Sequence, residues 1–317
     1  MSRAHQRIAV LSEQLAPSDA LSPEGLVQQA CSGAAFDFEP GKLLKGQVAI
    51  ITGSGQGIGR AAALLFAQHG CKVTVSDLDG AKADAVAEEI KKAGGEAIAV
   101  AGDVTDPAFP KKVVDATISA FKALHILVNN AGFTWDGVVH KMPDDQFETM
   151  FQVHCLAPFR LIREAAPHMR GAAIAEMDEL GEPRPRAIIN VSSVSGTHGS
   201  AGQINYSTAK SGLLGMTKTL AREWGPYNIR ANVVAFGYIQ TRLTAAKEDG
   251  ASIAYKGKEV KLGIPGSAEQ AEMAKMLIAL NRLGSPEEAA ASFLLLASPY
   301  ASYISGQLLE VTGGGWI

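Results

Sequence analysis

The chain alternates short apolar runs with helix-forming segments from about residue 46 onward, and this alternation restricts the fold more than any other feature. Apolar runs of roughly four to eight residues bounded by turn residues are typical of buried strands. Repeated strand–helix units connect parallel strands, so we expect an α/β fold whose doubly wound parallel sheet has helices on both faces. The predicted strands are Gln47–Thr52, Lys72–Ser76, Glu96–Ala101, His125–Val128, Ala187–Ser192, Ile229–Val234 and Gln307–Val311.

Three segments interrupt the alternation and divide the chain. Residues 1–45 form an N-terminal extension, which we expect to be an arm packed on its own or a neighbouring subunit, the alternative being a disordered tail. Residues 46–317 then form one domain. Residues 171–186 are expected to be an inserted loop, because the glycine and prolines near their end break helices. Residues 243–281 form a long excursion, which we interpret as a substrate lid with an apolar helix near Glu269–Leu280.

A glycine-rich turn follows the first predicted strand and opens the next predicted helix, with the sequence Thr-Gly-Ser-Gly-Gln-Gly-Ile-Gly. Glycines allow the backbone to turn sharply and to approach a pyrophosphate, whose negative charge is stabilised at a helix N-terminus. The turn therefore predicts a dinucleotide site formed by Thr52, Gly53, Gln56, Gly57, Ile58 and Gly59.

Asp77 ends the strand after the glycine turn, where an acid accepts hydrogen bonds from the adenosine ribose hydroxyls. A 2′-phosphate beside Asp77 would bring like charges together, and Gln56 is not a basic residue that would compensate. We therefore expect NAD to be preferred over NADP. The alternative for Asp77 is a solvated acid beside the Asp79–Gly80 turn.

Tyr206 and Lys210 are four residues apart on a predicted helix, Asn205–Trp224, and therefore share one face of it. An ammonium group near a phenol favours the phenolate, so the spacing predicts a tyrosine whose pKa is lowered enough to exchange a proton. Ser193 directly follows the preceding predicted strand, where its hydroxyl can hold a substrate oxygen. The three residues predict a proton-transfer site, and the glycine turn indicates that a hydride moves with the proton.

Composition excludes several other classes of protein. The formal net charge is −3 and no block of like charges is present, so neither nucleic acid nor an anionic membrane is an expected partner. Three widely spaced cysteines, without a Cys-x-x-Cys pair, argue against a disulfide scaffold or a zinc site, and no metal site is predicted. No apolar run reaches the length of a membrane span and no secretory signal is apparent, so we expect a cytoplasmic protein.

Together with the motifs Asn129–Gly132 and Tyr206–Lys210, these features resemble the short-chain dehydrogenase/reductase family over roughly residues 45–317. The resemblance implies a single-domain Rossmann fold with a seven-stranded sheet. It also implies that Tyr206 is the general acid/base, that Ser193 orients the substrate oxygen, and that Lys210 binds the nicotinamide ribose. Further implied cofactor contacts are Asp103, Val104, Asn130, Ala131, Gly132, Ile239 and Thr241.

His154 departs from the family pattern, in which asparagine usually follows valine in the long helix predicted over Asp144–Met169. The family asparagine acts largely through a local helix distortion that frees a carbonyl group. That backbone role would survive a change of side chain, and we favour it for His154. The alternative is that the imidazole joins a proton relay, because an unperturbed histidine titrates near neutral pH.

The segment Ser193–Ile239 is most similar to the beta-ketoacyl-acyl-carrier-protein reductases and 3-hydroxyacyl-CoA dehydrogenases of the family. This similarity implies an oxidoreductase acting on an apolar secondary alcohol or ketone, such as a 3-hydroxyacyl or 3-oxoacyl thioester. The acyl-carrier-protein reductases usually use NADP, which conflicts with Asp77. The alternative is a non-catalytic NAD-sensing protein, although such relatives usually lose the tyrosine or the lysine. A sugar epimerase is disfavoured because only a short segment follows Gly315.

A homodimer or homotetramer is also implied, because two helices in this family commonly pack against their counterparts in a second subunit. Here they are the predicted helices Asp144–Met169 and Asn205–Trp224. We expect the second helix to contribute an apolar stripe and small residues that allow close approach, namely Leu213, Leu214, Thr217, Leu220, Gly212 and Gly215.

Overall fold

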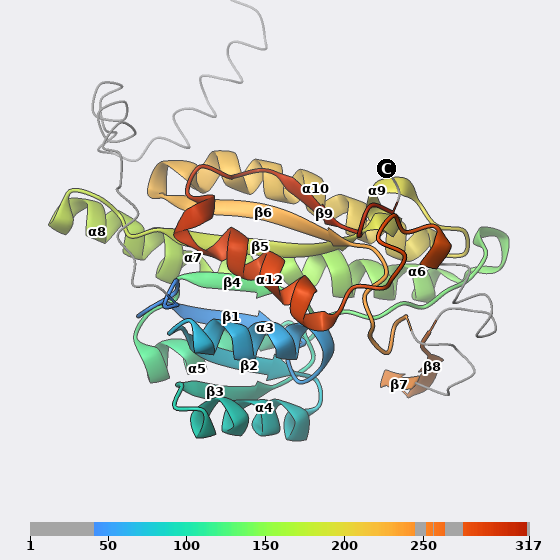
Figure 1. Ribbon diagram of the computed structural model, residues 1–317, viewed down its shortest axis with the longest axis horizontal. Coiled ribbons are helices and arrows are strands. Elements are labelled where there is room, and N and C mark those ends of the chain that lie inside the picture. The colour runs from blue at the N-terminus through green and yellow to red at the C-terminus, as the bar shows by residue number, and fades with distance from the viewer. Residues whose placement is uncertain (1–40, 245–251, 256, 264–274, 316–317) are drawn as a thin grey trace, which may run out of the picture.

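A computed structural model of the chain describes residues 41–244, 252–255, 257–263 and 275–315 (Figure 1). Its centre is a seven-stranded sheet in the order β3-β2-β1-β4-β5-β6-β9, with every neighbouring pair parallel. The fold class and the strand number predicted from the sequence are therefore confirmed. The strands are β1 (Val48–Thr52), β2 (Lys72–Asp77), β3 (Ala97–Ala101), β4 (Ile126–Asn129), β5 (Arg186–Ser193), β6 (Ile229–Phe236) and β9 (Leu308–Val311).

Helices cover both faces of the sheet because successive side chains of each buried strand point to opposite faces. In β1, Ile51 packs into the core under α3 (Gly57–Gln68), α4 (Gly80–Lys92) and α12 (Pro286–Ala297). Its neighbour Ile50 packs into the other core, under α5 (Phe109–Phe121), α7 (Ala157–Ala166) and α10 (Ile204–Trp224). Both isoleucines are fully buried, which explains why the strand reads as a continuous apolar run.

The last helix, α12, completes the first of these cores by lying beside α3. Phe66 of α3 and Phe293 of α12 are fully buried in the same core, and Phe293 contacts Phe236 of β6 edge to face at 5.5 Å between ring centroids. A helix near the end of the chain therefore covers apolar surface contributed by its beginning.

The long predicted helix is longer and less regular than expected. It runs through α6 (Asp144–Phe151), a π-helical turn (Gln152–Leu156), α7, a second π-helical turn (Pro167–Gly171) and α8 (Ala172–Leu180). The expectation of a loop over residues 171–186 was therefore wrong for its first part. The loop begins at Gly181, which takes a left-handed conformation (φ 79°) that favours glycine and ends the helix.

The predicted N-terminal arm and the excursion extend beyond the described residues. Residues 1–40 of the arm lie outside the described residues, whereas Leu44 is fully buried in the core and packs with the domain. In the excursion, two strands form an antiparallel hairpin, β7 (Ser252–Tyr255) and β8 (Lys258–Lys261). The helix predicted near Glu269–Leu280 lies largely outside the described residues; Lys275 and Met276 are helical, and residues 277–280 form turns and a bend.

The strand order reverses between β1 and β4, which are neighbours in the sheet but are followed by helices on opposite faces. In an open parallel sheet, this reversal leaves a crevice at the carboxyl ends of the strands, and ligands bind there. In the described part of the chain, no helix combines the length and the apolar character needed to cross a bilayer.

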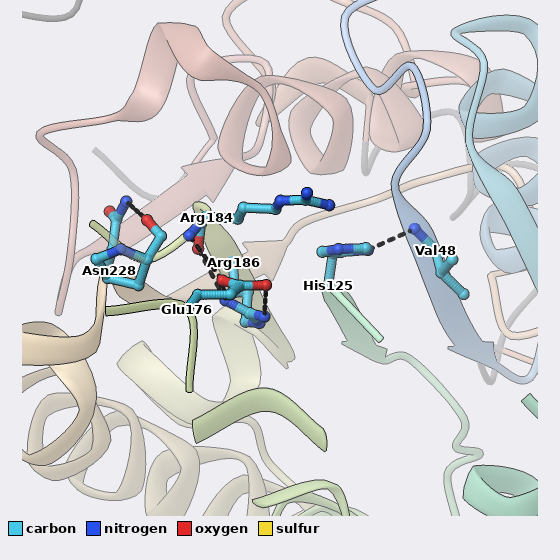
Figure 2. Close-up of polar contacts among 7 residues, drawn as sticks. Val48, His125, Glu176, Arg184, Arg186 and Asn228 are labelled. Atoms are coloured by element: carbon cyan, nitrogen blue, oxygen red, sulfur yellow. Dashed lines mark hydrogen bonds and ion pairs between the residues drawn. The ribbon is translucent and has the colours of Figure 1, made fainter. Parts of the chain in front are cut away.

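At the amino ends of the strands, opposite the crevice, a polar network fixes the starts of β1, β4 and β5 (Figure 2). The buried His125 ring accepts a 3.0 Å hydrogen bond at Nδ1 from the Val48 backbone N–H. Glu176 of α8 binds the Arg186 guanidinium through both carboxylate oxygens, at 2.8 and 2.9 Å, and also accepts the Arg184 backbone N–H. Burial, aided by the nearby Arg186 charge, lowers the pKa of His125 to about 4, so the ring is a neutral acceptor.

We predict that His125 makes the protein less stable as the pH falls from about 6.5 to 4. An unfolded histidine binds a proton near pH 6.5 whereas folded His125 binds one only near 4, so unfolding becomes easier by up to about 1.4 kcal/mol per pH unit. His125→Asn keeps an acceptor oxygen near the Nδ1 position but does not titrate. Urea unfolding at pH 7.5 and 5 is expected to show a smaller loss of stability for the variant; an equal loss in both proteins would contradict this assignment.

Candidate active site

Two neighbouring cavities lie at the carboxyl ends of the strands, and the glycine-rich turn forms a wall of the first cavity. This cavity has a volume of about 400 Å³. Its lining includes the predicted cofactor residues Gly53, Gln56, Gly57, Ile58, Gly59, Asp77, Asp103, Val104, Asn130, Ala131, Gly132 and Thr241. The fold therefore brings these predicted residues together from the ends of β1, β2, β3 and β4 and from the loop after β6.

The glycine turn has the geometry that a pyrophosphate requires. Gly57 takes a left-handed φ of 56°, and a Cβ atom on Gly59 would lie 2.2 Å from the Gly53 carbonyl oxygen, so a larger residue cannot occupy position 59. The turn opens α3 directly, which places the N-terminal dipole of that helix at the cavity. The residues present therefore fit a dinucleotide.

Thr52 is the one predicted cofactor residue that does not line this cavity or its neighbour. Its side chain is buried, and its hydroxyl accepts hydrogen bonds of 3.1 Å from the backbone N–H groups of Asn130 and Ala131. Asn130 Nδ2 in return donates to the carbonyl oxygens of Thr52 and Gly53. Thr52 thus holds the turn after β1 against the loop after β4.

Asp77 is held at the cavity wall by backbone donors. One carboxylate oxygen accepts a 2.9 Å hydrogen bond from the Gly55 N–H, and the other accepts a 3.1 Å bond from the Asp79 N–H. The Lys82 side chain begins beside Gly55 and Asp77, and its ammonium group forms an ion pair with Asp79 at 3.2 Å, whereas Arg242 lines the same cavity. The lining thus presents a carboxylate whose position is fixed by the glycine turn itself.

The second cavity, of about 560 Å³, contains the predicted catalytic residues. Ser193 comes from the end of β5, Tyr206 and Lys210 from the first turns of α10, and His154 from the π-helical turn. Ile239 and Thr241 also line it, and five residues (Ile58, Asn130, Gly132, Thr241 and Leu243) line both cavities. A ligand in the first cavity can therefore extend to the four catalytic candidates.

Burial controls the proton affinity of Tyr206. It raises the pKa of the phenol to about 12, while a hydrogen bond with the Ser193 side chain acts in the opposite direction and the Asp136 charge adds a smaller increase. The sequence-based expectation of a lowered tyrosine pKa was therefore wrong for this arrangement, because loss of water outweighs the neighbouring groups. The phenol is a protonated donor aimed at the same cavity as Ser193.

The Lys210 side chain is buried, and its ammonium group is hydrogen-bonded to the backbone. Its Nζ donates a 2.6 Å hydrogen bond to the Val191 carbonyl of β5 and lies 5.5 Å from the centre of the Tyr206 ring. Burial lowers the pKa of the lysine to about 7, so the charged and neutral forms are both present near neutral pH. The Ser192 hydroxyl donates to the Lys210 carbonyl at 2.9 Å, which fixes this turn of α10 against the strand.

His154 is a neutral side chain packed between Gly132 and Tyr206. Burial and then the Lys210 charge lower its pKa well below the usual value, even though its hydrogen bond with the Phe133 carbonyl, at 2.7 Å to Nε2, favours protonation. Its ring meets the Tyr206 ring edge to face at 4.9 Å. The π-helical turn that contains His154 is the distortion expected from the sequence, and Pro158 cannot donate an N–H to the His154 carbonyl.

Sequence reasoning missed a polar wall of the second cavity. The Ser195 hydroxyl donates to Gln203 Oε1 at 2.9 Å, and Gln203 Nε2 donates to Asp136 Oδ1 at 3.0 Å. These residues flank the predicted motifs, but nothing in their spacing marks them as neighbours. It also missed Ile253 and Tyr255, which reach the first cavity from the distant hairpin.

The chain is similar to known proteins over most of its length. Residues 47–252 match the family described as short chain dehydrogenase. The chain is 34% identical over 271 residues to a 3-oxoacyl-[acyl-carrier-protein] reductase of Thermotoga maritima, covering 86% of this chain and 98% of the relative. It is 36% identical over 272 residues to the Aquifex aeolicus protein of the same name, with the same coverage. The corresponding Vibrio cholerae reductase is 35% identical over 271 residues, again covering 86% and 98%.

Proposed function

This chain belongs to the short-chain dehydrogenase/reductase family, whose members are oxidoreductases with a nicotinamide cofactor, and we propose that it interconverts a secondary alcohol and a ketone with NAD(H). The preferred substrate class is apolar, with 3-hydroxyacyl and 3-oxoacyl thioesters first, because the similar proteins are 3-oxoacyl reductases. The observation that carries the proposal is the convergence of Ser193, Tyr206 and Lys210 on one cavity beside the glycine turn.

The chemistry follows from what each side chain can hold or move. The Ser193 and Tyr206 hydroxyls hydrogen-bond the substrate oxygen, and in the reducing direction Tyr206 Oη donates its proton to that oxygen. A nicotinamide held beside Lys210, Ile239 and Thr241 would supply the hydride for the carbonyl carbon, or accept it in the reverse direction. Lys210, beside the tyrosine, stabilises the phenolate that proton donation leaves behind, because the added negative charge favours the protonated ammonium.

The non-catalytic alternative, an NAD-sensing protein, requires the same cofactor cavity but no proton donor. Tyr206 is 9% exposed and faces the cavity beside Ser193, which suits proton transfer to a bound ligand rather than a purely structural role. The catalytic proposal is therefore preferred, and measurement of turnover separates the two.

NAD is the proposed cofactor in preference to NADP because of Asp77. Its carboxylate is fixed at the cavity wall by Gly55 and Asp79, so it cannot move away from a 2′-phosphate without breaking two hydrogen bonds. The nearby Lys82 is occupied by Asp79. The 3-oxoacyl substrate and the NAD preference thus rest on separate observations and can be tested separately.

We expect Tyr206→Phe to retain cofactor binding but to lower turnover by at least about 10²-fold, since it removes the transferable proton and keeps the ring. Turnover is measured on a panel of ketones and 3-oxoacyl thioesters with NADH and with NADPH, and NADH binding is measured by calorimetry. A wild-type protein that binds NADH but reduces no member of the panel would favour the sensing alternative. Turnover of the variant within a few-fold of wild type would remove Tyr206 from the mechanism.

Calorimetric titration is expected to show tighter binding of NADH than of NADPH. Asp77→Asn keeps a side chain of the same shape but removes its charge, so the difference between the two cofactors should narrow through improved NADPH binding. Glu89→Gln, an exposed acid on α4, is the control and should leave both affinities unchanged. A wild-type preference for NADPH would reject the assignment.

His154 is proposed to act through the distortion of its helix, because the neutral imidazole is a poor proton carrier at physiological pH. We expect His154→Asn to keep turnover within about tenfold of wild type and to leave the shape of the pH–rate profile unchanged. Loss of a limb of the profile in the variant would instead show that the imidazole itself titrates in the reaction.

A homodimer is proposed through α6–α7 and α10, but the residues that form its face differ from those expected. Leu213, Thr217 and Leu220 are buried in their own subunit and cannot form an interface stripe. The surface that remains contains Phe151 and Phe159, which are 41% and 43% exposed, and the exposed Gly212 and Gly215. Gly212 lies against Cys155. Because Cys155 is four residues from both Phe151 and Phe159 on the same long helix, the glycine lies close to both phenylalanines.

Gly215→Arg should convert the dimer, or a tetramer built from it, to smaller species, because a Cβ at Gly215 meets nothing within its own subunit while a long charged side chain would block close packing. Light scattering across micromolar concentrations measures the mass. Ala85→Arg, at an exposed position of α4, is the control and should leave the mass unchanged. A monomeric wild-type protein would exclude the proposed assembly.

A further inference from the structure

The excursion after β6 was expected to cover the substrate, yet its described hairpin lies elsewhere. Ile253 and Tyr255 of β7 line the first cavity, together with Asp77, Asp103 and Val104. In the same excursion, the second cavity receives Leu243, Thr244 and Gly263. Figure 1 shows β7 and β8 outside the carboxyl ends of the strands, on the side of the sheet where β1 and β2 lie.

We propose that the β7–β8 hairpin is an additional wall of the cofactor cavity and that Tyr255 is a positioning residue for the adenosine half of the dinucleotide. The inference rests on the proposed cofactor, and extends it by assigning a binding role to a segment outside the Rossmann strands and helices. It predicts that adenosine-containing ligands depend on Tyr255 whereas the nicotinamide half does not.

A chain of hydrogen bonds attaches Tyr255 to the adenosine side of the cavity. The Tyr255 and Thr105 hydroxyl oxygens lie 2.7 Å apart, and Thr105 donates both its hydroxyl and its backbone N–H to Asp103 Oδ1, each at 2.8 Å. Because a threonine hydroxyl has a single proton and Asp103 receives it, Tyr255 must be the donor in its bond with Thr105. The tyrosine thus helps to fix Asp103, which lines the cavity at the end of β3.

Apolar packing holds the rest of the hairpin in place. The Tyr255 ring contacts Phe133 at 5.3 Å between centroids, and Val260 and Leu262 are buried in the same cluster as Phe133 and Val153. An isolated two-stranded hairpin is only marginally stable in water, so this packing gives the segment its structure. Phe133 and Val153 themselves line the cavity, and the hairpin therefore supports its wall as well as extending it.

The test compares ligands that contain different halves of the dinucleotide. Calorimetry is performed on the full chain with NADH, ADP-ribose and nicotinamide mononucleotide. Tyr255→Ala is expected to weaken NADH and ADP-ribose by a similar factor of about tenfold or more. Nicotinamide mononucleotide should bind with unchanged affinity. Glu259→Ala, on the exposed side of the same hairpin, is the matched control and should affect none of the three.

Tyr255→Phe keeps the contact with Phe133 and removes only the hydroxyl, so it tests the proposal even where the alanine variant is poorly folded. It should weaken ADP-ribose by a few-fold, the size of one hydrogen bond, with an unchanged melting temperature in the absence of ligand. Unchanged ADP-ribose affinity in both variants, or equal weakening of all three ligands, would overturn the inference while the proposed function stands. A wild-type protein that binds neither NADH nor NADPH would instead reject the proposed function.

Discussion

The hydrogen bonds between Thr52 and the Asn130 segment are the contacts on which both cavities depend. β1 and β4 are the neighbours where the strand order reverses, so the loops that follow them diverge to opposite faces and leave the crevice between them. Thr52 and Asn130 exchange bonds across this point through both side chains and backbone. They define how far the glycine turn stands from the loop at Gly132, and so where a dinucleotide can pass from one cavity to the other.

The catalytic cavity concentrates groups that are costly to bury. A lysine, a tyrosine and a histidine lie side by side with little exposure. Burial raises the pKa of the tyrosine and lowers the pKa values of the lysine and the histidine, so each neutral form is favoured. Burial of such groups opposes folding, and two continuous apolar cores on the faces of the sheet provide the stability that offsets it. The gain for function is a site with little water, in which the movement of a single proton or hydride has a large electrostatic effect.

Sequence reasoning succeeded where a local signal reports a local structure. Buried strands such as Val48–Thr52 are apolar runs in the sequence. The shared face of Tyr206 and Lys210 was predicted correctly because both residues lie on one regular helix. It failed where the outcome depends on burial or on contacts distant in sequence. The pKa of Tyr206, the burial of Leu213 and the placement of Tyr255, bonded to a residue 150 positions earlier, are set by the tertiary structure. The helix Ala172–Leu180 was missed although a local signal was present, because the turn residues Gly181, Pro183 and Pro185 were extended to a loop that began ten residues too early.

The position of α12 has a consequence for how the chain is made. Synthesis proceeds from the N-terminus, so β1, α3 and the glycine turn are available long before residues 286–297. Until α12 is made, the part of α3 that packs on it stays exposed, and a nascent chain carries apolar surface of the kind that chaperones bind. The cofactor turn is therefore synthesised more than two hundred residues before the helix that closes the core beneath it.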